Sequence, residues 1–284
     1  MTTRAASLCV LLSSCVAGVA GCVDGDQGYG HDGYFDNEIV FGIDQTKGAD
    51  GKVTTSVGYE MLDVQGHGSR ARGVATPDLS CWAERLDDRL GQPKVAGGVA
   101  KLEGGLLPAG GVAIVANRGS DLTLPGPAWT NAGDMLTFQA QGFAMPDIDP
   151  EQVTMPSQDL ALLTPADAKA DVPVALDQDL AVTWTPGDKD ENVVASLTAV
   201  PAATPNARGV ELRCFFARSA GTGHFPQDLM RSFADLVGNA AGTPIKGKLS
   251  IATHRQLTIF ARGGWTVYVV ATAEQREQPF TLPR

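Results

Sequence analysis

Histidine is the side chain most often used as a general base or zinc ligand near neutral pH, and the chain has four. His31 lies in a Gly- and Asp-rich stretch, His67 in a Gly-rich loop, His224 before a predicted helix, and His254 in a predicted strand or turn. None has a second His or Cys at zinc-site spacing, and no His-Glu-x-x-His occurs. The elbow pattern Gly-x-Ser-x-Gly is absent too, so a Ser-His-Asp triad would need dispersed residues. We expect each histidine to be a surface or turn residue.

Two short acidic clusters are the next candidates, because carboxylates can bind calcium or serve glycoside hydrolysis. The carboxylates of a glycosidase face each other across a cleft, which neighbours on one turn rarely do. We therefore interpret both clusters as solvated hairpin tips. They are PDIDPE, with Asp147, Asp149 and Glu151, and GDKDEN, with Asp188, Asp190 and Glu191.

The tryptophans matter because sugar-binding β-sandwiches stack sugar rings on exposed indoles. Trp184 and Trp265 alternate in phase with apolar residues, so we expect them in the core. Trp129 lies in the predicted loop PGPAWTNAG and is the best candidate for an exposed ligand contact. A role in capping the end of a sandwich is the preferred alternative for it.

The N-terminus has the pattern of a secretory signal peptide, with Arg4, an apolar run over 8–20 and small residues at its exit. The run is shorter than the ~20 apolar residues of a bilayer span. Val19-Ala20-Gly21-Cys22 resembles the lipobox of bacterial lipoproteins. The resemblance implies cleavage before Cys22, a diacylglyceryl thioether on its sulfur and an acyl chain such as palmitate on its amine. A plain signal peptide with a chance cysteine is the alternative.

Residues 22–38 are rich in Gly and Asp without apolar periodicity, which predicts a flexible tether. A calcium loop using Asp24, Asp26, Asp32 and Asp36 is the alternative, but their spacing departs from the EF-hand pattern. The formal net charge of −10 argues against nucleic acid and against electrostatic docking onto anionic lipid.

Two of the five cysteines, Cys81 and Cys214, remain in the body if Cys9 and Cys15 leave with the signal and Cys22 carries lipid. Two cysteines in an exported body are a disulfide candidate. Buried cysteine is also a common small hydrophobe, and sequence does not show whether the two Cα atoms are close enough. A bridge and two free thiols therefore both stay open.

Apolar residues recur with a period of two through most of the body, which predicts half-buried antiparallel strands. The clearest hairpin is 256–272, where Gly263-Gly264 joins two alternating runs. FPQDLMRSFADLVGN predicts a helix near 227–237 that ends at Gly238-Asn239. A second short helix is a candidate at 78–91.

These elements predict a mainly β fold, an Ig-like antiparallel β-sandwich in two lobes with one or two short helices. The expected organisation is a signal peptide over 1–21, a tether over 22–38, an N-terminal β lobe over 39–165 and a C-terminal lobe over 166–284. One continuous two-sheet body is the alternative.

DLAVTW, GVELRC and FPQDLM, within 179–230, resemble the ectodomains of lipobox-bearing β-sandwich proteins of myxobacteria and their relatives. The resemblance implies an Ig-like fold and no established activity. These relatives often carry an acidic turn between the Cys strand and the helix. Here ARSAGTGH stands over 217–224, so the resemblance carries over no ligand at that turn.

The sequence thus predicts a lipid-anchored envelope protein acting as a non-enzymatic binding, adhesion or assembly module. Val23, rather than Asp, follows Cys22, which by analogy with the enterobacterial sorting rule favours the outer membrane. We expect membrane contact through the lipid, a protein or glycan partner, no cofactor and no nucleic acid. The alternatives are an envelope hydrolase with a dispersed site, and a calcium- or carbohydrate-binding module using the acidic loops and Trp129.

Overall fold

The computed structural model describes most of the chain from residue 37 onward. The predicted signal peptide and the tether up to residue 36 lie outside the described residues, as do Cys22, His31 and His67. Within the described part, no helix is both long and apolar enough to cross a membrane. The described ranges are 37–47, 50–63, 74–75, 80–86, 98–116, 122–142, 146–165, 172–201, 209–238, 244–262 and 264–282.

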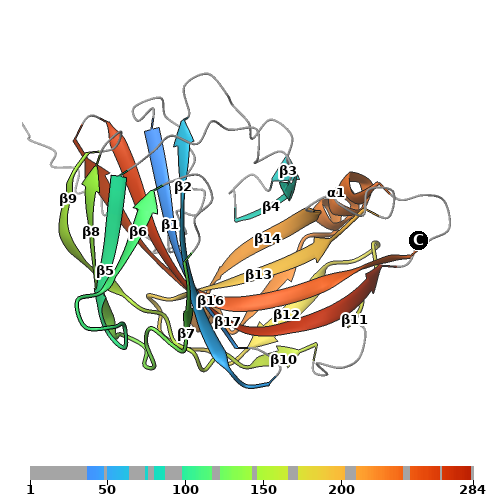
Figure 1. The fold of residues 1–284 in the computed structure, drawn as a ribbon. Coiled ribbons are helices and arrows are strands. Elements are labelled where there is room, and N and C mark those ends of the chain that lie inside the picture. Colours follow the sequence, from blue (N-terminus) through green and yellow to red (C-terminus); the bar gives the residue numbers. More distant parts are fainter. Residues whose placement is uncertain are drawn as a thin grey trace, which may run out of the picture.

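A twisted ten-stranded sheet runs through the whole body (Figure 1). Its two longest strands form the hairpin predicted from the alternating run, with Ala261 paired to Trp265. All its neighbouring pairs are antiparallel except those of β1 and β11 with β17. Across the sheet lie β3 (Val74–Ala75), β4 (Cys81–Arg85), β14 (Val210–Ala217), β13 (Asn192–Ala199), β16 (Ile245–Ala261), β17 (Trp265–Leu282), β1 (Asn37–Lys47), β2 (Val53–Asp63) and β7 (Leu122–Pro125), with β11 (Val172–Pro173) beside the far part of β17.

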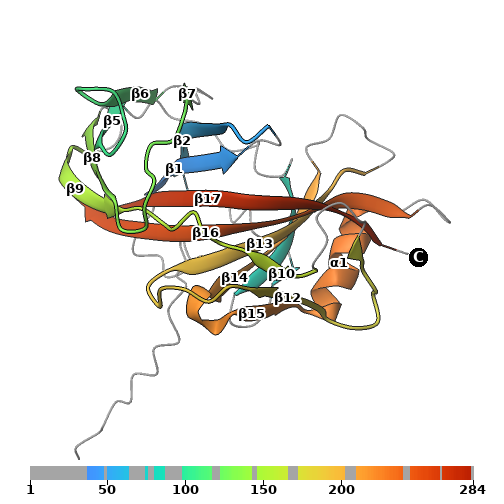
Figure 2. The same ribbon diagram turned by 90° about the horizontal axis from the view of Figure 1, so that it is seen from below.

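One face of this sheet carries two apolar cores in succession. Alternate residues of a strand share a face, so Ile251 and Leu257 of β16 point the same way. Ile251 belongs to one core and Leu257 packs against the other. Each core is closed by its own cover, and the two covers lie toward opposite ends of the β16–β17 hairpin (Figure 2).

The cover of the first core is a four-stranded sheet, and that of the second is a three-stranded sheet with one helix. In α1, Leu229, Met230 and Phe233 are buried and Gly238 ends the helix with φ +67°, as the sequence predicted. The first cover contains β6 (Val112–Ala116), β5 (Gly98–Gly104), β8 (Met135–Gly142) and β9 (Ile148–Thr154); the second contains β10 (Leu162–Thr164), β12 (Leu180–Trp184), β15 (Thr222–Phe225) and α1 (Gln227–Val237).

The mainly β, sandwich-like fold with one α-helix confirms the predicted fold class. Segments from both predicted lobes contribute to each core: Val267 and Val269 belong to the first core, and Cys81 and Ala83 to the second. The lobe boundary near residue 165 itself stays a prediction.

The second predicted helix, at 78–91, is wrong where the structure describes it, because residues 81–85 form strand β4. Cys81 and Ala83 are buried while Trp82 and Glu84 are half-buried, which is the period of a strand. Pairing of β4 with β14 thus overrides the local preference for a helix.

Candidate functional site

Polar side chains gather where the two apolar cores meet. On β16, Thr253 and Arg255 lie between the apolar residues of the two cores, on the same face. Thr253 is completely buried, and its hydroxyl donates to the carbonyl oxygen of Ser157, which follows β9. We call the group around them the junction cluster; it contains Ser157, Asp159, Asp188, Glu191, Arg218, Thr253 and Arg255.

Arg218 is the centre of the junction cluster. It begins the short 3-10 helix η3 (Arg218–Ala220), which Gly221 ends in the left-handed conformation. Its guanidinium donates to the carboxylate of Glu191 and, at 2.6 Å, to Asp159. Burial alone would lower the pKa of Arg218, but the hydrogen bonds to Glu191 and Asp159 outweigh it and raise that pKa. Arg218 therefore stays charged inside the protein.

Glu191 is completely buried and links Arg218 to the rest of the junction cluster. Its Oε1 accepts the backbone N–H of Ser157 at 2.9 Å and lies 3.4 Å from Nε of Arg255. Arg255 in turn donates to Asp188 at 2.8 Å. The hydrogen bond from the backbone N–H of Asp190, helped by the charge of Arg255, lowers the pKa of Asp188. Two arginines and three carboxylates thus form one connected network.

The backbone of the turn between β12 and β13 fits closely around Arg218. A Cβ atom at Gly187 would lie 2.2 Å from Nε of Arg218, so only glycine leaves room for the guanidinium. On the other side, the indole N–H of Trp184 donates to the carbonyl oxygen of Arg218 at 2.9 Å. The junction cluster therefore joins the segment after β9, the β12–β13 turn, the end of β14 and β16. We call each apolar core with its cover one half of the molecule, and we interpret the junction cluster as a clamp that fixes the two halves to each other.

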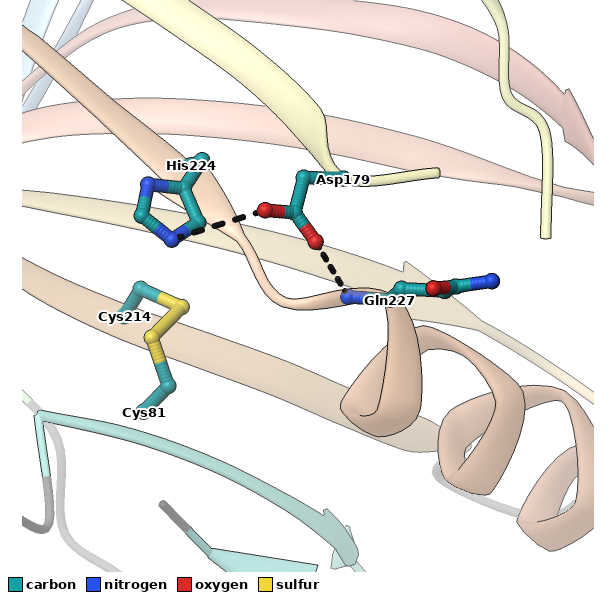
Figure 3. The surroundings of a disulfide bond; sticks show 5 residues. All are labelled: Cys81, Asp179, Cys214, His224 and Gln227. Carbon is teal, nitrogen blue, oxygen red and sulfur yellow. Dashed lines mark hydrogen bonds and ion pairs between the residues drawn. A yellow bond between two sulfur atoms is a disulfide. The ribbon is translucent and has the colours of Figure 1, made fainter. Parts of the chain in front are cut away.

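The Cys81 and Cys214 side chains form a disulfide, so of the two open alternatives the structure has the bridge (Figure 3). The two residues are direct neighbours on β4 and β14, with their Cα atoms 4.1 Å apart. Both are buried in the second core. The bridge joins strands that are 133 residues apart in the sequence.

His224 and Asp179 form a second polar group, near the disulfide in Figure 3. Asp179 accepts the backbone N–H of Gln227 at 2.8 Å and so caps the first turn of α1. Nε2 of His224 lies 3.7 Å from the other carboxylate oxygen, which exceeds the length of a hydrogen bond. Both side chains are more than half exposed. The arrangement is that of a helix cap with a histidine beside it.

Trp129 is completely buried, so the prediction of an exposed ring available to a ligand is wrong. The ring belongs to the first core, and its indole N–H donates to the carbonyl oxygen of Pro156 at 2.8 Å. A large ring with a satisfied N–H is more stable inside than in water. Trp184 is buried as predicted, and Trp265 packs partly buried against the first core.

Two further expectations about polar residues are corrected. Glu191 does not lie on a solvated hairpin tip, although Asp188 and Asp190 beside it are exposed. His254 is not a surface residue: its ring is buried edge-on against Phe215, with 5.2 Å between ring centroids.

Burial, with a smaller contribution from the charge of Arg213, lowers the pKa of His254 from 6.5 to about 3. The other acidic cluster fits the expected tip only in part: Asp147 precedes β9, is exposed and accepts the backbone N–H of Gly142, whereas Asp149 and Glu151 are exposed residues of strand β9 itself. Among the described residues, no group of three or more His, Cys, Asp or Glu is placed to hold a metal ion.

Comparison with known proteins adds no relative: no protein-family model matches the chain, and no curated protein is significantly similar to it. Sequence reasoning missed Arg218, Arg255 and Thr253. The signals available were an arginine in the turn ARSAGTGH and polar residues interrupting the apolar alternation of β16.

Proposed function

We propose that this protein is a lipid-anchored envelope protein whose body is a non-enzymatic binding or assembly module. The observation that carries the proposal is the buried Cys81–Cys214 disulfide. Disulfides form and persist in exported proteins and are rare where thiols are kept reduced. An exported body agrees with the signal-peptide pattern and with the lipobox ending at Cys22.

The construction of the body supports a scaffold that presents surfaces. The strands β16 and β17 contribute to both cores, the junction cluster fixes the two halves, and the disulfide ties β4 to β14. Loops held by such a rigid frame are where binding residues usually lie. We expect the lipid to hold the body on the outer membrane, with a protein or glycan as its partner.

Acylation tests the anchor directly. The full-length chain is produced in a bacterial host that processes lipoproteins and is labelled with an alkyne analogue of palmitate. We expect the wild-type chain to be labelled and to enter the detergent phase, and Cys22→Ala to lose both properties and stay uncleaved. Cys15→Ala, in the predicted signal peptide, is the matched control and should be labelled normally. Labelling that persists in Cys22→Ala would refute the anchor.

Crosslinking tests the binding role. The lipidated full-length protein is crosslinked in intact envelopes, solubilised and recovered. A partner that binds the folded body should also be recovered with Cys22→Ala, which lacks the lipid. The same protein or glycan should not be recovered with a variant that lacks the disulfide. If nothing beyond lipid is recovered, the binding role fails while the anchor stands.

A further inference from the structure

The first described residue of the body lies at the turn of the long hairpin. Strand β1 runs parallel to β17 and pairs Asn37 with Trp265. Trp265 is the first residue of β17 after the turn, and in Figure 1 β1 begins at the same end of the sheet as this turn. The segment leading back to Cys22 therefore joins the body beside the tip of the β16–β17 hairpin.

This position limits how far the tip can lie from any bilayer that holds Cys22. Asn37 is fifteen positions after Cys22, and a chain reaches at most ~3.6 Å per position, or about 54 Å. The other end of β17, at Leu282, lies a further ~56 Å along the strand at ~3.3 Å per residue. A lipid on Cys22 thus confines the hairpin tip to within about 54 Å of the membrane, whereas the opposite end can lie about twice as far away.

The side chains at the tip suit the boundary between lipid headgroups and acyl chains. Phe260 is 69 % exposed, the highest value among the large apolar side chains that the described residues expose. Arg262 beside it is exposed, and Trp265 is partly buried against the first core. Tryptophan prefers membrane interfaces, an inserted phenylalanine removes apolar area from water, and a guanidinium binds phosphate.

A lipid surface fits this tip better than a protein partner. A stable protein interface buries about 1,000 Å² or more, whereas the tip offers one prominent ring and an arginine. A weak contact suffices for a tip that is already tethered, because tethering raises its effective concentration at the bilayer. Glu38 and Asp63 lie at the same end of the sheet by register, so the contact depends on Phe260 rather than on net charge.

We propose that Phe260 and Arg262, together with Trp265 on the opposite face of the hairpin, form a membrane-contact tip that docks the body tip-first on the bilayer carrying its lipid. This inference rests on the proposed lipidation of Cys22. Docking would orient the molecule, with the second core and α1 pointing away from the membrane and available to a partner.

Site-specific labelling of the lipidated full-length protein tests the docking. Phe260→Cys carries an environment-sensitive fluorophore, and Leu163→Cys, at an apolar residue 53 % exposed on the other half, is the matched control. In vesicles of phosphatidylethanolamine and phosphatidylglycerol, we expect a spin-labelled lipid to quench position 260 several-fold more than position 163. Arg262→Cys, which keeps the ring of Phe260, carries the same fluorophore in a parallel measurement, and its quenching must agree with that of Phe260→Cys.

The outcomes separate this inference from the lipid anchor. If the protein floats with the vesicles but both labels respond only to an aqueous quencher, docking is wrong and the anchor stands. If position 260 is shielded from both quenchers, the tip contacts protein instead, which also overturns the inference. If the protein does not float at all, the anchor fails and the docking fails with it.

Discussion

The guanidinium of Arg218 and the carboxylate of Glu191 are paired where both side chains are almost completely removed from water, with 4 % and 0 % of their areas exposed. Burying two charges is costly, and their attraction offsets that cost only when further hydrogen bonds satisfy both groups. Here Asp159 accepts a second hydrogen bond from Arg218, and Glu191 accepts one from Ser157 and lies within ion-pair distance of Arg255, although Nε of Arg218 is buried without a hydrogen-bond partner. Removing one partner would leave the other as an uncompensated buried charge.

Breaking this pair should therefore destabilise the protein strongly. We expect Glu191→Gln to lower the free energy of unfolding by about 3–5 kcal/mol, measured by urea denaturation. The matched control is Lys248→Met, which breaks the Lys248–Glu277 pair, a contact of 2.7 Å between side chains that are 65 % and 50 % exposed. An exposed pair contributes about 1 kcal/mol or less. Equal losses in the two variants would show that the junction cluster is not a clamp.

Gly187 tests the same cluster from the backbone side. Because a Cβ atom there would lie 2.2 Å from Nε of Arg218, Gly187→Ala should displace the guanidinium and cost about 1–3 kcal/mol in thermal or urea unfolding. In an Arg218→Ala background the added methyl has room, so the destabilisation caused by Gly187→Ala should largely disappear. Gly42→Ala is the control, since its Cβ would meet only Asp44 at an ordinary 3.4 Å. Additive losses in the double variant would contradict the contact.

The elements that sequence predicted well are those defined by neighbouring residues. The β16–β17 hairpin follows from alternation around Gly263-Gly264, and α1 follows from one apolar helical face ended by Gly238. Both patterns lie within a single continuous segment, so the local period suffices to identify them.

The junction cluster could not be predicted, because its partners meet only through the order of strands in the sheet. Glu191 is 27 residues and Asp159 is 59 residues from Arg218. The hypothesis of an exposed Trp129, which ranked below a capping role, failed for a related reason: a ring in a loop between strands is exposed or buried depending on which core the loop covers, here the first. Cys81 was predicted to lie in or near a short helix, because the residues around it do not show that their strand pairs with β14, more than a hundred residues away.

His254 should make the stability of the protein depend on pH. Burial lowers its pKa to about 3 in the folded state, so between about pH 3 and 6.5 the unfolded state binds the proton more readily. The neutral, buried His254 therefore contributes its full share of the free energy of unfolding above pH 6.5. This contribution falls as the pH decreases through the window, by up to about 1.4 kcal/mol per pH unit.

His254→Leu isolates this contribution, because leucine has a similar size and no proton to bind. We expect its urea-unfolding free energy to change less between about pH 5 and 6.5 than that of the wild type. The slopes of the two free energies against pH should differ by an amount equivalent to the uptake of up to one proton on unfolding. Below that range, titrating carboxylates add their own dependence in both proteins, so the comparison is made above it. Parallel curves for wild type and variant would mean that the buried imidazole is protonated equally in both states.

The disulfide gives a prediction that also reports on the anchor. In the processed, lipidated chain the Cys22 sulfur is alkylated and Cys81 and Cys214 are bridged, so denatured, unreduced protein should contain no free thiol. One free thiol would agree with the bridge but contradict lipidation of Cys22. Two free thiols in acylated protein would contradict the bridge and keep the anchor.

Stability measures what the bridge contributes. The closed loop spans 133 residues, for which the chain-entropy model gives about 4–5 kcal/mol, and removal of native disulfides typically costs about 2–5 kcal/mol. We expect Cys81→Ala combined with Cys214→Ala to lose a free energy of unfolding in that range, measured with urea. Reducing agent should destabilise the wild type and leave the double variant unchanged.

Because β4 is a short strand paired to β14 near one edge of the sheet, we expect it to separate first when the bridge is removed. Hydrogen exchange would then speed up in residues 81–85 before it does in β16 and β17, whereas uniform acceleration would show that the bridge stabilises the body only as a whole.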